Sequence, residues 1–488
     1  MIASIIGSGV AGLSSSIHLA KKGYSVHVFE KNATYGGKLT QIQLEKYRFD
    51  AGPSLFTMPQ YVTEMLDHAH FEKFEFEKLE TLCHYFFSDG TTFNAPSNKE
   101  EFFSLAANTF QEPESQIRKF LKQSEKTYQI TAPVFLQSSL HKIKTYINRS
   151  GIYGILNLWR IDMFRNMNTA ISKTFHNKNI IQLFNRYATY NGSDPYRAPA
   201  TLNVIPHLEY HYGAFLPKDG MQSIAKILYE QALSLGVEFH FNTEVRTIYK
   251  SNNSLTYLEL PNNTLFKSDI FIANCDAKLL YKKLLKTTVP QKLKKAENSS
   301  SALIFYWGIK KEFPQLDVHN IFFAEDYQKE FQSIFQAKSC QEDPTIYINI
   351  TSKKIKSDAP NGCENWFVMI NTPCNDGQDW DIFRAEAKEK IIAKLSKTLG
   401  CDIASLIEVE EYLDPVRIEQ FTGSNKGSLY GSSSNHRMSA FFRQANFSSK
   451  YKNLYFCGGS VHPGGGIPLC MLSAKILSDI IPNANSRK

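Results

Sequence analysis

The sequence lacks the features that mark several large classes of protein. No two of its eight cysteines have the two-residue separation typical of a zinc or dithiol redox site. No uncharged apolar run approaches the ~18 to 20 residues needed to span a bilayer. The segment after Met1 has neither a basic leader nor a small-residue cleavage site. We therefore expect reduced cysteines, no bound metal, and a cytoplasmic chain that does not cross a membrane.

Charge of one sign is also scarce. The 55 lysines and arginines exceed the 47 aspartates and glutamates by only +8 over 488 residues, which does not indicate a nucleic-acid binder. Aromatic residues are abundant at 13%, as expected either for large cores or for a long apolar ligand channel. A chain of this length exceeds one compact core, so two or three domains are expected.

The first thirty residues have the pattern of a strand, a turn, a helix and a second strand. Residues 2–6 are apolar, glycines recur over residues 7–12, helical spacing follows over residues 13–20, and a second apolar strand covers residues 25–29. The complete unit, rather than the glycines alone, predicts a dinucleotide site. A purely structural glycine turn is the poorer interpretation.

Each residue type in this unit has a physical task. Gly7 allows the tight turn, Gly9 lets the backbone approach a pyrophosphate, and Gly12 lets the helix pack closely on the strand. Free amides at the helix start, around Ala11, attract the phosphates. Glu30 ends the second strand and can accept hydrogen bonds from both hydroxyls of an adenosine ribose, so NADP is disfavoured.

A second pair of glycines follows closely. Gly36 and Gly37, with the cations Lys31 and Lys38, would carry a loop over the pyrophosphate. An ordinary NAD-dependent dehydrogenase would not need this extension, which favours FAD as the dinucleotide.

The amino-terminal segment resembles the FAD-binding amino-oxidase and phytoene-desaturase superfamily. The resemblance includes Gly52, Pro53 and Ser54, and the matching segment of that superfamily lies beside the flavin ring. A later strand at residues 237–241 leads to Val245, and a valine at the equivalent place pairs its backbone with the adenine. The resemblance implies FAD as the cofactor.

The carboxyl end supplies a second helix start. Residues 453–457 form a strand that runs into glycines, among them Gly459 and Gly466, and a helix follows from Ile467. Pro468 suits its first turn. Amides at this helix start can face the negative charge of a reduced flavin. The segment is similar to the carboxyl-terminal motif of bacterial phytoene desaturases.

Within that family, residues 48–59 and 83–87 resemble the 1-hydroxycarotenoid 3,4-desaturase branch. The resemblance implies an FAD-dependent oxidoreductase acting on CH–CH bonds, which introduces a C–C double bond into an acyclic or monocyclic carotenoid, most specifically at positions 3,4 of a 1-hydroxycarotenoid. Asp219 and the pair Leu469-Cys470 depart from the family pattern and leave the exact substrate open. No residue is isolated as a catalytic base.

Three alternatives remain from the sequence. The first is a phytoene desaturase. The second is a flavin amine oxidase, which often attaches its cofactor through a cysteine, and Cys457 lies near the corresponding strand. The third is a non-enzymatic prenyl-binding or escort protein on the same fold.

The expected fold class is α/β, with a Rossmann-like FAD-binding domain and a discontinuous mixed-sheet and helical substrate domain. We expect the FAD-binding domain to comprise residues 1–90, 213–294 and 423–488. Residues 91–212 would form a helical, membrane-facing substrate domain, and residues 295–422 a further substrate domain.

Residues 133–178 combine positive charge with apolar side chains. Asp162 is the single acid in this segment. Its cations are Lys142, Lys144, Arg149, Arg160, Arg165, Lys173 and Lys178. Basic residues beside aromatic and aliphatic ones suit an interfacial helix on an anionic membrane, so we expect peripheral association with the inner membrane and a long apolar polyene as the substrate. A solvated helical cap packed on the core would explain the pattern equally well.

Overall fold

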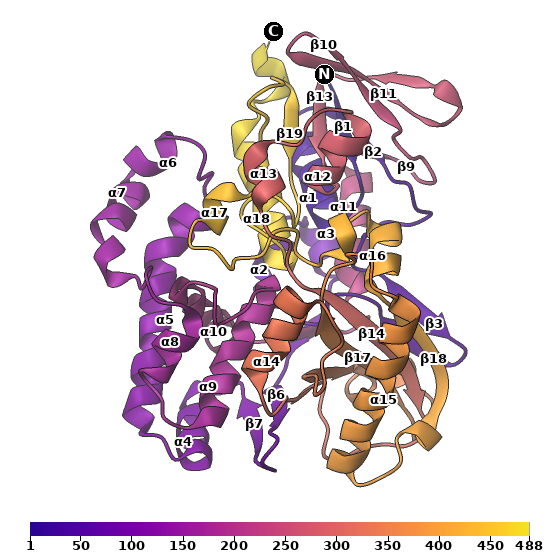
Figure 1. Cartoon of the computed structure of the whole chain (residues 1–488). Coiled ribbons are helices and arrows are strands. Elements are labelled where there is room, and N and C mark those ends of the chain that lie inside the picture. The colour runs from indigo at the N-terminus through magenta and orange to yellow at the C-terminus, as the bar shows by residue number, and fades with distance from the viewer. Residues whose placement is uncertain (488) are drawn as a thin grey trace.

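The computed structural model describes residues 1–487 and arranges them as a parallel sheet, a mixed sheet and a helical flank (Figure 1). The parallel sheet has the strand order β19-β13-β1-β2-β9. Its strands are β1 (Ile2–Ile6), β2 (Ser25–Phe29), β9 (Glu238–His240), β13 (Ile270–Ala273) and β19 (Leu454–Phe456). Every neighbouring pair in this sheet is parallel. Strands far apart in the sequence therefore bring their carboxyl ends to one edge.

Three helices pack with this sheet in one apolar core: α1 (Val10–Lys21), α11 (Gln222–Ser234) and α18 (Ile467–Ile480). By length and composition, residues 467–486 could cross a membrane. More than half of that window is buried in the protein, however, and α18 packs against α1. We therefore assign α18 to the core.

The second sheet has the order β18-β14-β17-β16-β15-β6-β7. Its strands are β6 (Thr81–Phe86), β7 (Thr92–Pro96), β14 (Ser301–Ile309), β15 (His319–Phe322), β16 (Ile346–Ile350), β17 (Glu364–Thr372) and β18 (Ile407–Leu413). Its pairs are antiparallel apart from β15 with β6. One face packs on α15 (Trp380–Leu399), so alternate side chains face the interior of the molecule.

The helical flank covers the other side of that interior. It comprises α4 (Lys99–Phe110), α5 (Glu114–Phe135), α6 (Lys144–Ile147), α7 (Arg149–Leu156), α8 (Met167–Ser172) and α9 (Lys178–Asn185). Side chains of α4, α5, α8 and α9 share a core with β6 and β7. In Figure 1, α6 and α7 project to the left of the remaining helices.

Short elements complete the chain. The further strands are β3 (Gln41–Leu44), β4 (Tyr47–Asp50), β5 (Phe76–Lys78), β8 (Phe215–Pro217), β10 (Thr247–Ser251), β11 (Ser254–Glu259) and β12 (Leu265–Lys267). The further helices are α2 (Gln60–Thr63), α3 (His68–Phe71), α10 (Ile205–His207), α12 (Ala277–Leu279), α13 (Gln291–Lys295), α14 (Tyr327–Gln332), α16 (Pro415–Thr422) and α17 (Ser439–Phe442).

The predicted fold class is confirmed. A parallel, Rossmann-like sheet is built from distant parts of the chain, and a mixed sheet with helices lies beside it. The boundaries of the five predicted segments stay predictions. Strand β6, which lies inside the first of those segments, belongs to the mixed sheet rather than the parallel one.

Candidate cofactor and substrate cavity

A cavity of about 2270 Å³ begins at the carboxyl edge of the parallel sheet and continues between the mixed sheet and the helical flank. Its volume is more than twice the upper end of the ~300–1,000 Å³ usual for a small-molecule site. Glu30 lines one part of it, and Tyr347 and Phe164 line others. The space is therefore large enough for a dinucleotide together with a second long ligand.

The sequence-predicted site residues gather on this cavity. The lining ones are Gly7, Gly9, Ala11, Glu30, Lys31, Gly37, Lys38, Gly52, Pro53, Ser54, Val245, Gly459, Gly466 and Ile467. Gly12 does not line the cavity. A Cβ on Gly12 would lie 2.2 Å from the backbone oxygen of Gly7, so this glycine permits close packing of α1 on the turn. Individual contacts with the cofactor stay predictions.

The turn before α1 is prepared for an anion. Gly7 has a φ of +101°, and Gly9, at the N-cap of α1, has no side-chain capping bond. The first turn of α1 contains no acidic residue. The second glycine pair lies directly against this turn, because Gly36 N donates to Ser8 O at 2.9 Å and a Cβ on Gly37 would be 3.2 Å from Gly9 Cα. The free amides and the close backbone approach suit a pyrophosphate.

Glu30 has a structural task in addition to the predicted ribose contact. One of its carboxylate oxygens accepts hydrogen bonds from the Ser8 backbone N at 2.8 Å and from Ser8 Oγ at 2.9 Å. The other accepts one from Asn32 N at 3.0 Å. The carboxylate is buried but lines the cavity, so the bonds that hold it also fix the glycine turn.

The two predicted cations differ in their surroundings. Lys38 is half-buried, and its Nζ donates to the backbone oxygens of Leu429 at 2.7 Å and Ser428 at 3.3 Å. Burial lowers the pKa of Lys38 to about 8. Lys31 is exposed and its Nζ donates to Gln420 O at 2.6 Å. Each lysine thus ties the amino-terminal segment to a distant loop.

Asn274 is a residue of this site that sequence reasoning missed. It follows β13 directly, at the carboxyl edge of the parallel sheet, and its Nδ2 donates to Gly7 O at 3.2 Å. A Cβ on Gly9 would come within 3.0 Å of Asn274 Nδ2, and one on Gly458 within 2.9 Å of Asn274 Oδ1. Asn274 therefore joins the two glycine segments. Its place immediately after a buried parallel strand was the available signal.

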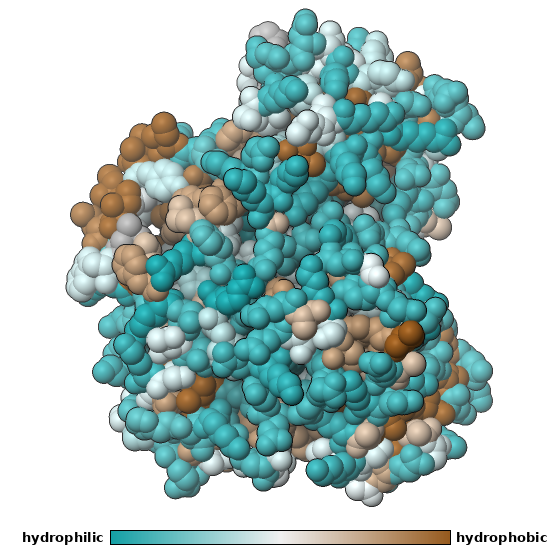
Figure 2. All heavy atoms as spheres, in the orientation of Figure 1, coloured by the Kyte–Doolittle hydropathy of each residue, from teal (hydrophilic) through white to brown (hydrophobic). Residues whose placement is uncertain are grey.

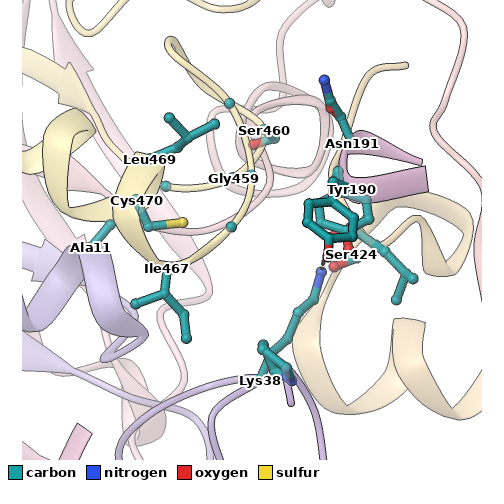
Figure 3. A pocket seen from close by; sticks show the side chains of 18 of the residues that line it. Ala11, Lys38, Tyr190, Asn191, Ser424, Gly459, Ser460, Ile467, Leu469 and Cys470 are labelled. Carbon is teal, nitrogen blue, oxygen red and sulfur yellow. Dashed lines mark hydrogen bonds between the residues drawn. The ribbon is translucent and has the colours of Figure 1, made fainter. Parts of the chain in front are cut away.

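The start of α18 lies across the cavity from Lys38 (Figure 3). Gly466 is its N-cap, with a φ of +107° and no side-chain capping bond, and Pro468 lies in the first turn as predicted. Ile467 and Cys470 from α18 face the side of the pocket from which Lys38 and Tyr190 approach. A second uncapped helix start therefore reaches the same space.

The remainder of the cavity is mainly apolar and reaches the surface. Tyr306 and Phe367 contribute from the mixed sheet, and Phe135 contributes from α5. Ile155 and Phe164 line the cavity while being 50% and 75% exposed. The apolar part therefore opens among exposed apolar side chains next to α7.

A buried polar cluster lies beside this apolar part. The Arg186 guanidinium donates to Glu209 at 3.0 Å, to Tyr85 Oη at 2.7 Å and to Tyr190 Oη at 2.9 Å. Tyr187 Oη also donates to Glu209 at 3.0 Å. No local sequence pattern predicts this cluster, because its members come from three separate segments that meet only in the folded chain: Tyr85 from β6, residues 186–190, and Glu209.

One group of metal-ligating side chains lies elsewhere. His27, Glu238 and His240 share a face at the edge of the parallel sheet. His27 Nδ1 is 3.3 Å from His240 Nε2, and the ring planes differ by 16°. This is a hydrogen-bonding distance between two rings, so a ring-to-ring hydrogen bond accounts for the contact.

Comparison with known proteins identifies the family. The model of the family described as flavin containing amine oxidoreductase matches residues 10–481. The chain belongs to this family. This flavin oxidoreductase is 49% identical to the 1-hydroxycarotenoid 3,4-desaturase of Flavobacterium sp. (strain P99-3), over 99% of each chain. It is 30% identical to the phytoene desaturase of Fusarium fujikuroi, over 98% of this chain and 88% of that one.

A solved structure agrees at the level of the fold. The crystal structure of an oxidoreductase from Methanosarcina mazei is 12% identical, with a TM-score of 0.65 over 98% of this chain and 100% of that one. The predicted family and the predicted cofactor, FAD, are confirmed. The two uncapped helix starts, the glycine cradle and Glu30 fit such a dinucleotide.

Proposed function

We propose that the chain is an FAD-dependent carotenoid desaturase that oxidises the 3,4 bond of a 1-hydroxycarotenoid. The observation that carries this proposal is the single cavity, which joins a dinucleotide cradle to a long apolar space open at an apolar surface. The name of the 49% identical relative supports the finer assignment. Phytoene desaturation, named for the 30% identical relative, is the runner-up.

The chemistry divides between the cofactor and the chain. When bound, FAD supplies the acceptor for a hydride from a C–C single bond beside the polyene, while a neighbouring carbon releases a proton to form the new double bond. Tyr306, Phe367 and Phe135 would hold the polyene and exclude water. The polyene delocalises the positive charge left by hydride loss, so a weak proton acceptor suffices.

The desaturase proposal is tested with purified, flavin-loaded protein under anaerobic conditions. A 1-hydroxycarotenoid in detergent or vesicles should bleach the flavin absorbance and yield a product with one more conjugated double bond, seen as a red-shifted spectrum. Bleaching by phytoene instead would favour the runner-up. Absence of bleaching with any polyene would contradict the enzyme and favour an escort role.

The amine-oxidase alternative receives no support from Cys457. This thiol is buried, Ser15 Oγ donates to its Sγ at 3.4 Å, and burial raises its pKa to about 12. A thiol held in the protonated form is a poor nucleophile for covalent attachment of a flavin. Acid precipitation should therefore leave the yellow cofactor in the supernatant, whereas a yellow pellet would revive the alternative.

A membrane surface is the proposed source of the substrate, with the chain peripheral on the cytoplasmic side of the inner membrane. Large apolar side chains gather on α6, α7 and the following turn, where Figure 2 shows a brown patch at the upper left. Ile143, Trp159 and Phe164 are each at least 75% exposed. Exposed clusters of this kind mark interaction sites, and the cavity opens within this one.

Positive charge surrounds this apolar patch. Lys144, Arg149 and Arg160 are exposed within it. Helix α13 adds the exposed Lys292. This ammonium lies near His141, whose pKa is lowered mainly by burial and further by the charge of Lys292. A patch with both apolar and cationic side chains suits an anionic bilayer surface.

The membrane proposal is tested with vesicles. Replacing Trp159 and Phe164 by serine should lower partitioning into anionic vesicles by roughly tenfold or more, since each side chain contributes up to ~1.5–3 kcal/mol when fully buried. Ile382→Ser is the matched control, because Ile382 is also exposed but lies on α15 in another part of the molecule. Equal losses in both variants would contradict this docking surface.

A further inference from the structure

A short line of polar side chains interrupts the aromatic wall of the cavity. It consists of Ser54, Tyr347 and His319. Tyr347 lies on β16 and His319 on the neighbouring β15, where the pairing of Ile321 with Tyr347 and of His319 with Asn349 places all four side chains on one face. Ser54 reaches this face from the amino-terminal segment.

The direction of the hydrogen bonds in this line is inferred from Asn349. Asn349 Nδ2 donates to Val318 O at 3.0 Å, which sets the orientation of the amide, and the same nitrogen lies 3.3 Å from His319 Nδ1. An amide N–H only donates, so this contact favours a lone pair on His319 Nδ1 and the ring proton on Nε2, although Nε2 is buried and has no hydrogen-bond partner among residues 1–487.

The hydroxyl of Tyr347 therefore donates to His319, and their atoms are 2.7 Å apart. Because the Tyr347 proton is used in that bond, Tyr347 Oη accepts a hydrogen bond from Ser54 Oγ, also at 2.7 Å. Burial lowers the pKa of His319 to about 4, so the ring is neutral and keeps this direction at physiological pH.

Ser54 is where the line meets the cavity. Its Oγ makes one hydrogen bond within residues 1–487, the one to Tyr347. Its lone pairs are therefore unused, and the side chain is half-buried on the cavity wall. Ser54 thus presents an oriented hydrogen-bond acceptor inside an apolar space, which suits a ligand that carries a donor and no charge.

We propose that Ser54, oriented by Tyr347 and His319, accepts a hydrogen bond from a hydroxyl at the end of the polyene and so selects hydroxylated substrates. This inference rests on the proposed function. In a 1-hydroxycarotenoid the hydroxyl is two carbons from the bond oxidised at positions 3,4. Ser54 lines the same cavity as the dinucleotide cradle, and a Cβ on Gly52, two residues earlier, would lie 1.9 Å from the backbone oxygen of Lys38 in that cradle, so one site can hold the hydroxyl and leave that bond near the cofactor.

The test compares two polyenes of the same length, one with a terminal hydroxyl and one without, using flavin-loaded protein. The readout is the ratio of their kcat/KM values. Ser54→Ala should lower this ratio about tenfold, the size of a lost neutral hydrogen bond. Tyr347→Phe keeps the aromatic ring but releases the Ser54 proton, and it should lower the ratio a few-fold.

Thr201→Val is the matched control, since it removes another hydroxyl from the same cavity and should leave the ratio unchanged. An unchanged ratio in Ser54→Ala would overturn the subsite while leaving the desaturase intact. If Ser54→Ala loses flavin, Tyr347→Phe decides in the same way. A wild-type protein that oxidises neither polyene would instead overturn the proposed function.

Discussion

The two ends of the cavity are built by different parts of the chain. At the dinucleotide end, backbone atoms make the surface, and Gly7, Gly9 and Gly37 are there because a Cβ would intrude or the backbone requires a positive φ. At the substrate end, side chains make the surface, and Arg186, which lines the cavity, is paired there with the buried Glu209. The shape of the dinucleotide end therefore depends on glycines that lack a Cβ, and that of the substrate end on pairing between buried charges and hydroxyls.

The largest expected effect comes from breaking the Arg186–Glu209 ion pair at the substrate end. Glu209→Gln leaves the Arg186 guanidinium buried without its counter-charge, which should lower the free energy of unfolding by ~3–5 kcal/mol. The control is Glu100→Gln, which breaks the exposed pair with Arg118 and should cost at most ~1 kcal/mol. Urea unfolding measures both, and similar losses would show that burial does not distinguish the two pairs.

The second-largest effect comes from adding one atom, a Cβ, at the dinucleotide end. In Gly12→Ala the new Cβ would overlap Gly7 O at 2.2 Å, so the turn must shift at a cost of ~1–3 kcal/mol. Flavin affinity should fall by roughly tenfold to 100-fold, measured by titrating FAD into stripped protein.

Gly400→Asn is the control for that change. Gly400 has a left-handed conformation, with no atom within 4 Å of an added Cβ, and asparagine tolerates this conformation. Flavin affinity should be unaffected. Weak flavin binding in both variants would mean that general destabilisation, rather than the cradle, explains the result.

The smallest effect concerns Lys38, a charged side chain at the backbone-built end. Its folded pKa of about 8 lies below the ordinary 10.5, so the unfolded chain binds more protons between these values. The free energy of unfolding contributed by Lys38 should therefore rise as pH increases from about 8 towards 10.5. Lys38→Met should lack this rise, and the difference between the two flavin-free proteins from pH 7 to 9.5 measures it. Parallel curves would contradict the burial of this ammonium.

The same contrast explains what the sequence could reveal. Gly7 and Glu30 were predictable because their spacing within the amino-terminal strand–turn–helix–strand unit determines their positions, and the start of α18 was predictable because it follows its own strand and glycines. The exposed apolar side chains near α7 were only half predictable. Composition identified residues 133–178, but the pattern fitted a buried cap equally well until exposure was known.

His319 and Tyr347 could not be found in this way. Their meeting depends on the register of β15 with β16, and Ser54 joins them from almost 300 residues away in the sequence. Such long-range side-chain contacts leave no periodic trace in a single sequence. Asn274 is the intermediate case, since the end of a buried parallel strand marks its place but not its bond to Gly7.

The continuity of the cavity has a consequence for the order in which FAD and the polyene bind. Because the dinucleotide cradle and the apolar space are one continuous cavity, a bound FAD would form part of the wall of the polyene-binding site. Loading should then be ordered, with the yellow cofactor first and the polyene second. Without its cofactor, the protein would lack one wall of the polyene-binding site. It should then bind the polyene weakly even where every aromatic residue is intact.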